Sequence, residues 1–221
     1  MTSSAPVRRE RTREITIGPV ALDGLLELPD ASAGIVLFAH GSGSGRFSPR
    51  NNFVARALRD SGFATLLFDL LTEEEAQDRA NVFDIPLLAE RLSMATAWVI
   101  QDRDTAALPI GYFGASTGAA ATLVAAAAGA WPIAAIVSRG GRPDLAGAAL
   151  TKVTAPTLLI VGGDDATVLE LNRAALAELR CEKHLAVVPG ATHLFEEPGA
   201  LETVVDLAGN WFTSHLAKDA P

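Results

Sequence analysis

Residues 110–120 read IGYFGASTGAA, an apolar run that ends in the pattern Gly-x-Ser-x-Gly and continues into an alanine-rich segment. This pattern predicts a strand, a sharp turn and a helix, with the hydroxyl of Ser116 at the tip of the turn. The turn residue is strained, so the residues two before and two after it must lack bulk, and Gly114 and Gly118 meet this requirement. The stretch therefore predicts a reactive serine above the edge of a sheet.

The same pattern is open to two other interpretations. A tight strand–helix turn can use small residues for packing alone, and a Gly-rich dinucleotide loop has a similar composition. The dinucleotide interpretation is disfavoured, because the glycines do not follow G-x-G-x-x-G and the strand lies in mid-chain. A reactive serine also requires a base, an acid and donors for an oxyanion elsewhere in the chain.

The composition is that of an acidic globular protein. Of the 221 residues, 49% are hydrophobic and 20% are charged, which suits one domain with a sizeable core. The formal net charge of -8 disfavours a nucleic-acid partner, because phosphates would be repelled. Cys181 is the only cysteine, so the chain cannot form an internal disulfide and suits a reducing cytoplasm.

The N-terminal residues 1–13 are polar and rich in arginine, so we expect a flexible tail there and a single domain over residues 14–221. No apolar signal core follows the tail, which favours a cytoplasmic location. The long alanine-rich region is interrupted by Gly129 and Pro132, so neither a membrane-spanning segment nor a membrane partner is expected.

Apolar runs and amphipathic segments alternate along the rest of the chain. The expected strands are 15–20, 22–28, 34–39, 64–68, 110–113, 133–138, 157–161 and 184–188. The expected helices are 52–61, 85–101, 119–128, 168–179 and 201–216, with a short helix at 143–150. This alternation predicts an α/β fold with a mostly parallel sheet and helices on both faces. No large cap is expected, because the chain shows no obvious insertion between residues 138 and 157.

Chemistry in such sheets lies beyond the carboxyl ends of the strands, and this rule selects the candidate base. His193 follows strand 184–188 in a loop and lies downstream of Ser116, so it is the predicted base. His184 and His215 fall within predicted elements, where a structural role is favoured.

Two aspartates are candidates for the acid that orients this histidine. Asp164 and Asp165 follow the strand 157–161, where either can face the histidine while the other caps the next helix or faces solvent. With Ser116 before them and His193 after them, the order serine, aspartate, histidine is that of the α/β-hydrolases.

Acyl transfer also needs N–H donors for the developing oxyanion. The residue after the nucleophile, Thr117, offers one backbone N–H. The loop 40–45, which we call the oxyanion loop, reads HGSGSG and follows a buried strand. The backbone N–H of Ser42 in this loop is the second candidate donor. His40 and Gly41, at the start of this loop, are candidate substrate-binding residues.

Arginines are expected on the same side of the sheet. Arg139 and Arg142 follow the strand 133–138, and Arg46 and Arg50 follow the oxyanion loop. A guanidinium that leans into the site would bind a carboxylate or phosphate of an anionic substrate. Alternatively, these are surface arginines paired with nearby acids such as Asp144.

With these residues in place, the chain resembles the α/β-hydrolase superfamily, and within it the small dienelactone-hydrolase-like serine hydrolases. The resemblance covers residues 15–216 and rests on the motifs at 40–41, 114–118, 162–168 and 190–193. The third motif, G-x-x-D-x-x-V, implies that Asp165 is the acid rather than Asp164. Dienelactone hydrolases proper have a cysteine at the elbow, where this chain has Ser116. Segments 68–74 and 138–144 resemble a branch in which some members are fused to phosphoribosyltransferase domains.

Residues and resemblance together predict a serine hydrolase that cleaves a small ester-type substrate, a carboxylester or lactone. Ser116, His193 and Asp165 would act through an acyl-enzyme; no cofactor or metal is implied, and a monomer or homodimer is expected. The alternative is a non-catalytic small-molecule-binding protein on the same scaffold, because fold does not determine function. A missing triad member or oxyanion loop would favour this alternative, and none is missing from the sequence.

Overall fold

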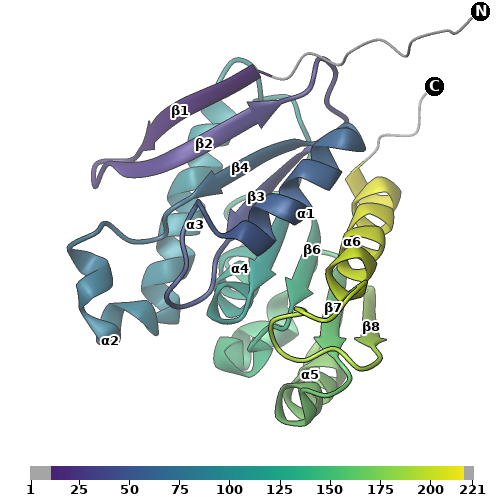
Figure 1. Ribbon diagram of the computed structural model, residues 1–221. Coiled ribbons are helices and arrows are strands. Elements are labelled where there is room, and N and C mark those ends of the chain that lie inside the picture. Colours follow the sequence, from purple (N-terminus) through teal and green to yellow (C-terminus); the bar gives the residue numbers. More distant parts are fainter. Residues whose placement is uncertain (1–10, 217–221) are drawn as a thin grey trace, which may run out of the picture.

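An eight-stranded sheet runs through the centre of the computed structural model, which describes residues 11–216 (Figure 1). The strands lie in the order β1-β2-β4-β3-β5-β6-β7-β8. Their bounds are Arg11–Ile17 (β1), Leu22–Leu28 (β2), Ile35–Ala39 (β3), Ala64–Phe68 (β4), Ile110–Ala115 (β5), Ile133–Arg139 (β6), Thr157–Gly162 (β7) and Lys183–Val188 (β8). The hairpin β1–β2 joins β4 in antiparallel fashion, and all other neighbours pair in parallel. The expected fold class, a mostly parallel α/β sheet, is confirmed.

Helices cover both faces of this sheet, as expected. Their bounds are Pro49–Asp60 (α1), Arg79–Val82 (α2), Ile85–Gln101 (α3), Thr117–Ala127 (α4), Ala166–Glu178 (α5) and Ala200–Leu216 (α6), with 3-10 segments at Glu75–Gln77 (η1) and Pro143–Lys152 (η2). Helices α1 and α6 lie on one face, and α3, α4 and α5 on the other (Figure 1). Between β6 and β7 the chain forms only η2 and short connections, so no large cap covers the sheet there.

The first strand begins at Arg11, earlier than the sequence pattern predicts. Residues 11–13, expected in the tail, therefore belong to the sheet, and residues 1–10 lie outside the described part of the chain. The ladder with β2 pairs Arg11 with Leu28, so β1 extends along the whole of β2. The Arg13 guanidinium also donates to Asp102 at 2.8 Å and to Asp104 at 3.0 Å. These acids follow α3, about 90 residues away in the sequence, so apolar periodicity cannot reveal the contact.

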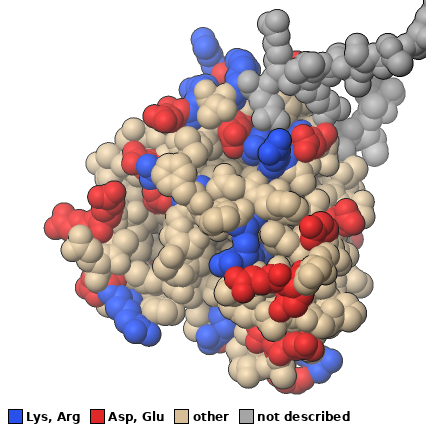
Figure 2. Space-filling model, in the orientation of Figure 1, with Lys and Arg blue, Asp and Glu red and all other residues tan. Residues whose placement is uncertain are grey.

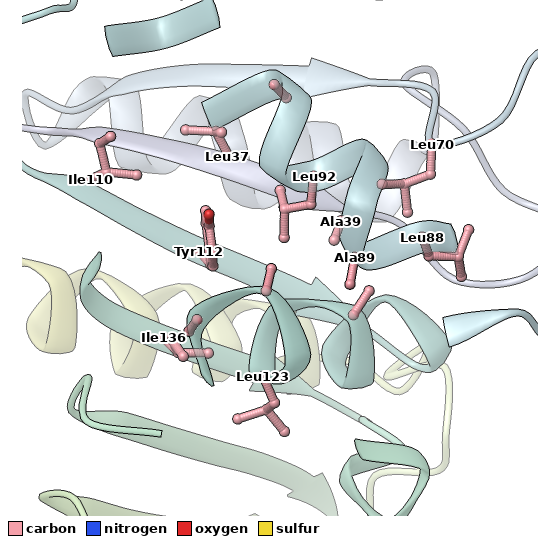
Figure 3. Packing of buried hydrophobic residues seen from close by; sticks show 14 of the residues in the cluster. Leu37, Ala39, Leu70, Leu88, Ala89, Leu92, Ile110, Tyr112, Leu123 and Ile136 are labelled. Atoms are coloured by element: carbon pink, nitrogen blue, oxygen red, sulfur yellow. The ribbon is translucent and has the colours of Figure 1, made fainter. Parts of the chain in front are cut away.

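Buried strands divide their side chains between two cores, because successive residues point to opposite faces. In β3, Leu37 packs toward α3 and α4, whereas Val36 and Phe38 pack toward α1 and α6. Figure 3 shows the first of these cores, with side chains from the sheet and from α3 and α4 in one layer. The buried hydroxyl of Tyr112 is satisfied within it by Thr96, with 2.6 Å between the two oxygens.

Parallel pairing brings the loops with the predicted chemistry to one edge of the sheet. The carboxyl ends of β3, β5, β6, β7 and β8 all lie there, because these strands pair in parallel in adjacent register. Each of the five strands is followed by a loop that holds one or more candidate residues. The fold therefore places the site before any side-chain interaction is considered.

Candidate functional site

Ser116 lies between β5 and α4 with φ 50° and ψ -120°, a conformation that residues with side chains rarely adopt. This strain is the signature of the predicted elbow. Ser116 occupies the N-cap position of α4, yet its side chain makes no capping hydrogen bond. The hydroxyl is therefore not used by the helix.

Close backbone contacts explain why the elbow needs its glycines. A Cβ at Gly114 would lie 2.5 Å from the Cα of Ala119, and one at Gly118 would lie 2.2 Å from the carbonyl oxygen of Ala39. Gly41 from the oxyanion loop packs in the same way, because its Cβ would lie 2.9 Å from the Cβ of Ser116. The small residues that the motif requires hold β3, β5 and α4 together.

We expect Gly118→Ala to lower the free energy of unfolding by about 3 kcal/mol, because the added methyl group overlaps two backbone carbonyls and the packed core has no room for it. Gly209→Ala in α6 is the matched control, since a Cβ there meets nothing within 4 Å. The control should stabilise the protein by up to about 1 kcal/mol through helix propensity. Urea unfolding measures the free energy of unfolding of both variants. Equal values for Gly118→Ala and Gly209→Ala would contradict the packing argument.

His193 and Asp165 are brought together, although 28 residues separate them in the sequence. Nδ1 of His193 lies 2.7 Å from Oδ2 of Asp165. An ionised carboxylate only accepts hydrogen bonds, so Nδ1 carries the proton and Nε2 is left as an acceptor. Asp165 lies at the N-cap position of α5 but makes no side-chain capping bond there. Its neighbour Asp164 is exposed, which matches the solvated role that the sequence left open for one of the pair.

Ser116 and His193 line one cavity of about 190 Å³, which we call the serine cavity. The oxyanion loop borders it through Gly41, Ser42 and Ser44. Thr117 begins α4, where the first backbone N–H groups have no partner within the helix. Both predicted oxyanion donors therefore belong to segments that meet at the elbow.

A second cavity of about 250 Å³ lies on the other side of the oxyanion loop, and we call it the leucine cavity. Its walls are mainly apolar and include Leu70, Leu71 and Leu88, with Thr117 at the border to the elbow. The sequence pattern does not predict this cavity. The apolar pair after strand β4 was the available signal, but only the fold shows that it faces α3 across an empty space.

His40 lines the leucine cavity, and its ring is held by hydrogen bonds to the backbone. Its Nδ1 donates to the carbonyl oxygen of Gly41 at 3.0 Å, and its Nε2 accepts the N–H of Leu70, also at 3.0 Å. Burial lowers the pKa of His40, with smaller opposing contributions from the Gly41 hydrogen bond and from Asp69. Both ring nitrogens thus bind backbone groups, and the ring connects the loops after β3 and β4.

This environment predicts a pH dependence of stability. The folded pKa of His40 lies below the ordinary value of 6.5, so the unfolded chain binds more protons near that pH. The stabilising contribution is complete above the unfolded pKa and is lost as the pH falls toward the folded value. We expect the loss of unfolding free energy between about pH 7.5 and about pH 5.5 to be larger in wild type than in His40→Gln. Urea titrations of both proteins at both pH values measure this loss of unfolding free energy. Equal losses in wild type and His40→Gln would contradict the lowered pKa of His40.

The arginines separate into two groups. Arg142 forms two hydrogen bonds with Asp144, at 2.8 and 2.7 Å, and does not line the serine cavity. The structure thus favours a scaffold role for Arg142 over substrate binding. Arg46 pairs with Asp69 and also lies outside the serine cavity. Arg139, in contrast, is buried and lines the serine cavity, and burial followed by the nearby Arg50 charge lowers its pKa to about 10.

The described residues also allow statements about surface charge, membrane-spanning helices and metal ligands. Figure 2 shows acidic and basic side chains interspersed on one face of the molecule, without a continuous basic surface on that face. Within residues 11–216, no helix has the length and apolar character to cross a membrane, and no group of three or more potential ligands is arranged to hold a metal ion.

The fold and the serine elbow, with a histidine and an aspartate beside it, define a protein of the α/β-hydrolase class. The chain belongs to the dienelactone hydrolase family. A dienelactone hydrolase from Anabaena variabilis is 54% identical to it; the match covers 95% of this chain and 99% of that one, with a TM-score of 0.89. The family resemblance seen in the sequence motifs is thus confirmed.

Two other comparisons concern length and fold. Two Mycobacterium tuberculosis proteins, both provisionally named phosphoribosyl transferases, are 59% identical over 216 residues. That match covers 98% of this chain and 49% of each relative, so the chain spans about half their length. An α/β serine hydrolase without a lid from Xanthomonas campestris shares the fold at 22% identity, with a TM-score of 0.78 over 98% of this chain and all of that one. No protein-family model matches the chain.

Proposed function

We propose that this chain is a serine hydrolase that cleaves a small carboxylester or lactone. One observation carries the proposal: His193 is hydrogen-bonded to Asp165 at 2.7 Å and lines the same cavity as the strained Ser116. Serine at its ordinary pKa is a poor nucleophile, and an oriented histidine is the group that activates it.

The proposed reaction has two halves. The Ser116 oxygen attacks the ester carbonyl carbon while Nε2 of His193 takes the serine proton. The bond to the alcohol oxygen then breaks, and His193 returns the proton to that oxygen, which leaves an acyl group on Ser116. Water attacks the acyl-enzyme by the same route and releases the acid. Asp165 holds the imidazole in the required tautomer and stabilises its charged form.

The developing negative charge needs donors that are already oriented. The backbone N–H groups of Thr117 and Ser42 are the proposed pair, and α4 adds the positive end of its dipole. The elbow directs the first turn of α4 toward the reacting carbonyl group, so the helix stabilises the charge on its oxygen while Ser116 attacks its carbon. These steps use side-chain and backbone groups of this chain, together with water.

Covalent labelling tests this function directly. The protein should react with a fluorophosphonate probe at Ser116 and hydrolyse short- to medium-chain esters or small lactones. Binding of such esters without labelling or turnover would instead support the non-catalytic binding protein. Residues 11–216 form an α/β-hydrolase fold, so the proposed function of this chain differs from the phosphoribosyl transferase name of the longer relatives.

A further inference from the structure

The last residue of β6 and the three residues that follow it lie between the nucleophile and the two residues that act on it. We call these residues, 139–142, the β6 loop. In the sheet, β6 lies between β5, which leads into Ser116, and β7, which leads into Asp165. His193 follows β8, the next strand beyond β7. The β6 loop is therefore the part of this edge that separates Ser116 from its acid and base.

Both backbone polar groups of Ser116 bind the β6 loop. The N–H of Ser116 donates to the carbonyl oxygen of Arg139 at 3.3 Å, and the carbonyl oxygen of Ser116 accepts the N–H of Arg142 at 3.0 Å. Ser116 has a positive φ, so these bonds hold a residue whose conformation is otherwise unfavourable. The position of the nucleophile thus depends on the position of the loop.

The same loop also packs against the base. Gly140 has φ 50°, and a Cβ there would lie 3.1 Å from the carbonyl oxygen of His193 and 3.6 Å from Cε1 of its ring. The ring atom Cε1 is bonded to both ring nitrogens, so it belongs to the part of the imidazole that handles the proton. A side chain at position 140 would therefore displace His193 by a few tenths of an ångström.

Backbone hydrogen bonds join the histidine loop to the start of α5. The N–H groups of residues 163 and 164 donate to the carbonyl oxygens of residues 188 and 191, at 2.8 and 3.0 Å respectively. Together with the bond between His193 and Asp165, these contacts make the base, the acid and α5 one unit. The β6 loop connects this unit to Ser116.

Asn172 of α5 anchors the β6 loop. Its side chain is fully buried, and Nδ2 donates to the carbonyl oxygen of Gly141 at 3.0 Å and to that of Val168 at 2.8 Å. Its Oδ1 has no hydrogen-bond partner among the described residues, which is costly for a buried acceptor. A leucine has the same branching and would avoid this cost, so the asparagine is useful here for the hydrogen bond that it donates to the loop.

We propose that Asn172 and Gly140 are positioning residues that act through the β6 loop and fix the distance over which the Ser116 proton moves to Nε2 of His193. The inference rests on the proposed hydrolase function. Proton transfer needs heavy atoms about 2.6–3.2 Å apart, and a misplacement of about 1 Å can cost about 100-fold in rate. Acylation and deacylation both use this transfer, so both should slow by a similar factor. We therefore expect changes in the loop to lower kcat and to leave KM nearly unchanged.

The first test changes the contact with the base. In Gly140→Ala, kcat for a short-chain ester should fall by about 10-fold to 100-fold, with KM within about two-fold of wild type. Gly147→Ala is the matched control and should keep the wild-type kcat. Gly147 has φ 51°, so alanine brings the same backbone strain, but within the described part of the chain a Cβ there meets nothing closer than 4 Å. Rates are expressed per active site, counted from the complete reaction of Ser116 with a fluorophosphonate probe, so an unfolded fraction does not lower them.

The second test removes the anchor. Asn172→Leu loses the donor to Gly141 and should lower kcat per active site by about 10-fold or more, again without a rise in KM. Thr157→Val is the matched control and should keep the wild-type kcat. Thr157 is also fully buried and donates to the carbonyl oxygen of Ala155 at 2.9 Å, but it begins β7 at the opposite edge of the sheet. The double variant Gly140→Ala/Asn172→Leu should lose less than the product of the two single losses, because both changes act through one loop.

A wild-type kcat per active site in Gly140→Ala, or equal losses in the loop variants and their controls, would overturn the inference. A raised KM with unchanged kcat would also overturn it, because the loop would then act in ester binding. A loss confined to Gly140→Ala would remove Asn172 from the assignment. Asn172→Ala, which removes the donor without adding bulk, replaces Asn172→Leu if that variant does not fold, and the Gly140 pair decides if neither folds. Wild type that is neither labelled nor active on esters would end the proposed function and this inference together.

Discussion

Alanine in place of Ser116 is expected to abolish fluorophosphonate labelling and to lower kcat for short-chain esters by about 10⁶-fold, the scale seen when a serine nucleophile is removed. The protein should stay folded. Loss of a capping serine costs about 0.5–2 kcal/mol, but the Ser116 side chain makes no capping bond to α4. We therefore expect the free energy of unfolding to change by less than about 1 kcal/mol.

Ser44→Ala is the matched control for this experiment. Ser44 also lines the serine cavity, but it lies in the loop after β3 and has no proposed part in the reaction. Its replacement should leave covalent labelling in place. Labelling that persists in Ser116→Ala would show that another residue is the nucleophile, and the proposed mechanism would have to be abandoned.

The elbow could be predicted from the sequence because its requirements are local. A strained turn needs small residues at fixed positions, and the contacts of Gly114 and Gly118 show why. The loops of His193 and Asp165 could also be predicted, since each follows a buried strand and the carboxyl ends of parallel strands share an edge. What was needed in each case was a short sequence pattern and one rule of topology.

Features that depend on a distant partner could not be predicted in this way. The ion pairs between Arg13 in β1 and acids beyond α3 are one example. The sequence likewise presents Arg139 and Arg142 as equivalent, only three residues apart after one strand. They differ because Asp144 lies within reach of Arg142, whereas the Arg139 side chain is buried at the serine cavity. Which acids surround a buried side chain is a property of the fold.

The two adjacent aspartates show the same limit and allow a direct test. Adjacent residues after a strand have side chains in different directions, so the sequence alone left both as candidates for the acid. In the structure Asp165 accepts the Nδ1 proton of His193 at 2.7 Å, while Asp164 is exposed. Asp164→Asn is therefore a matched control for Asp165→Asn, with the same chemical change one residue away.

Asp165→Asn is expected to lower kcat for a neutral ester by about 10⁴-fold, as when the acid of a serine triad is replaced by its amide. The asparagine amide can donate to Nδ1 of His193, which moves the imidazole proton to Nε2. A protonated Nε2 cannot accept the proton of Ser116, so the nucleophile is not activated even though the geometry is retained. Asp164→Asn should change kcat by less than about 10-fold, because Asp164 is exposed and the Nδ1 hydrogen bond of His193 goes to Asp165. Steady-state kinetics on both variants measures the difference, and a larger loss in Asp164→Asn would show that the hydrogen bond between His193 and Asp165 is not the one that orients the base.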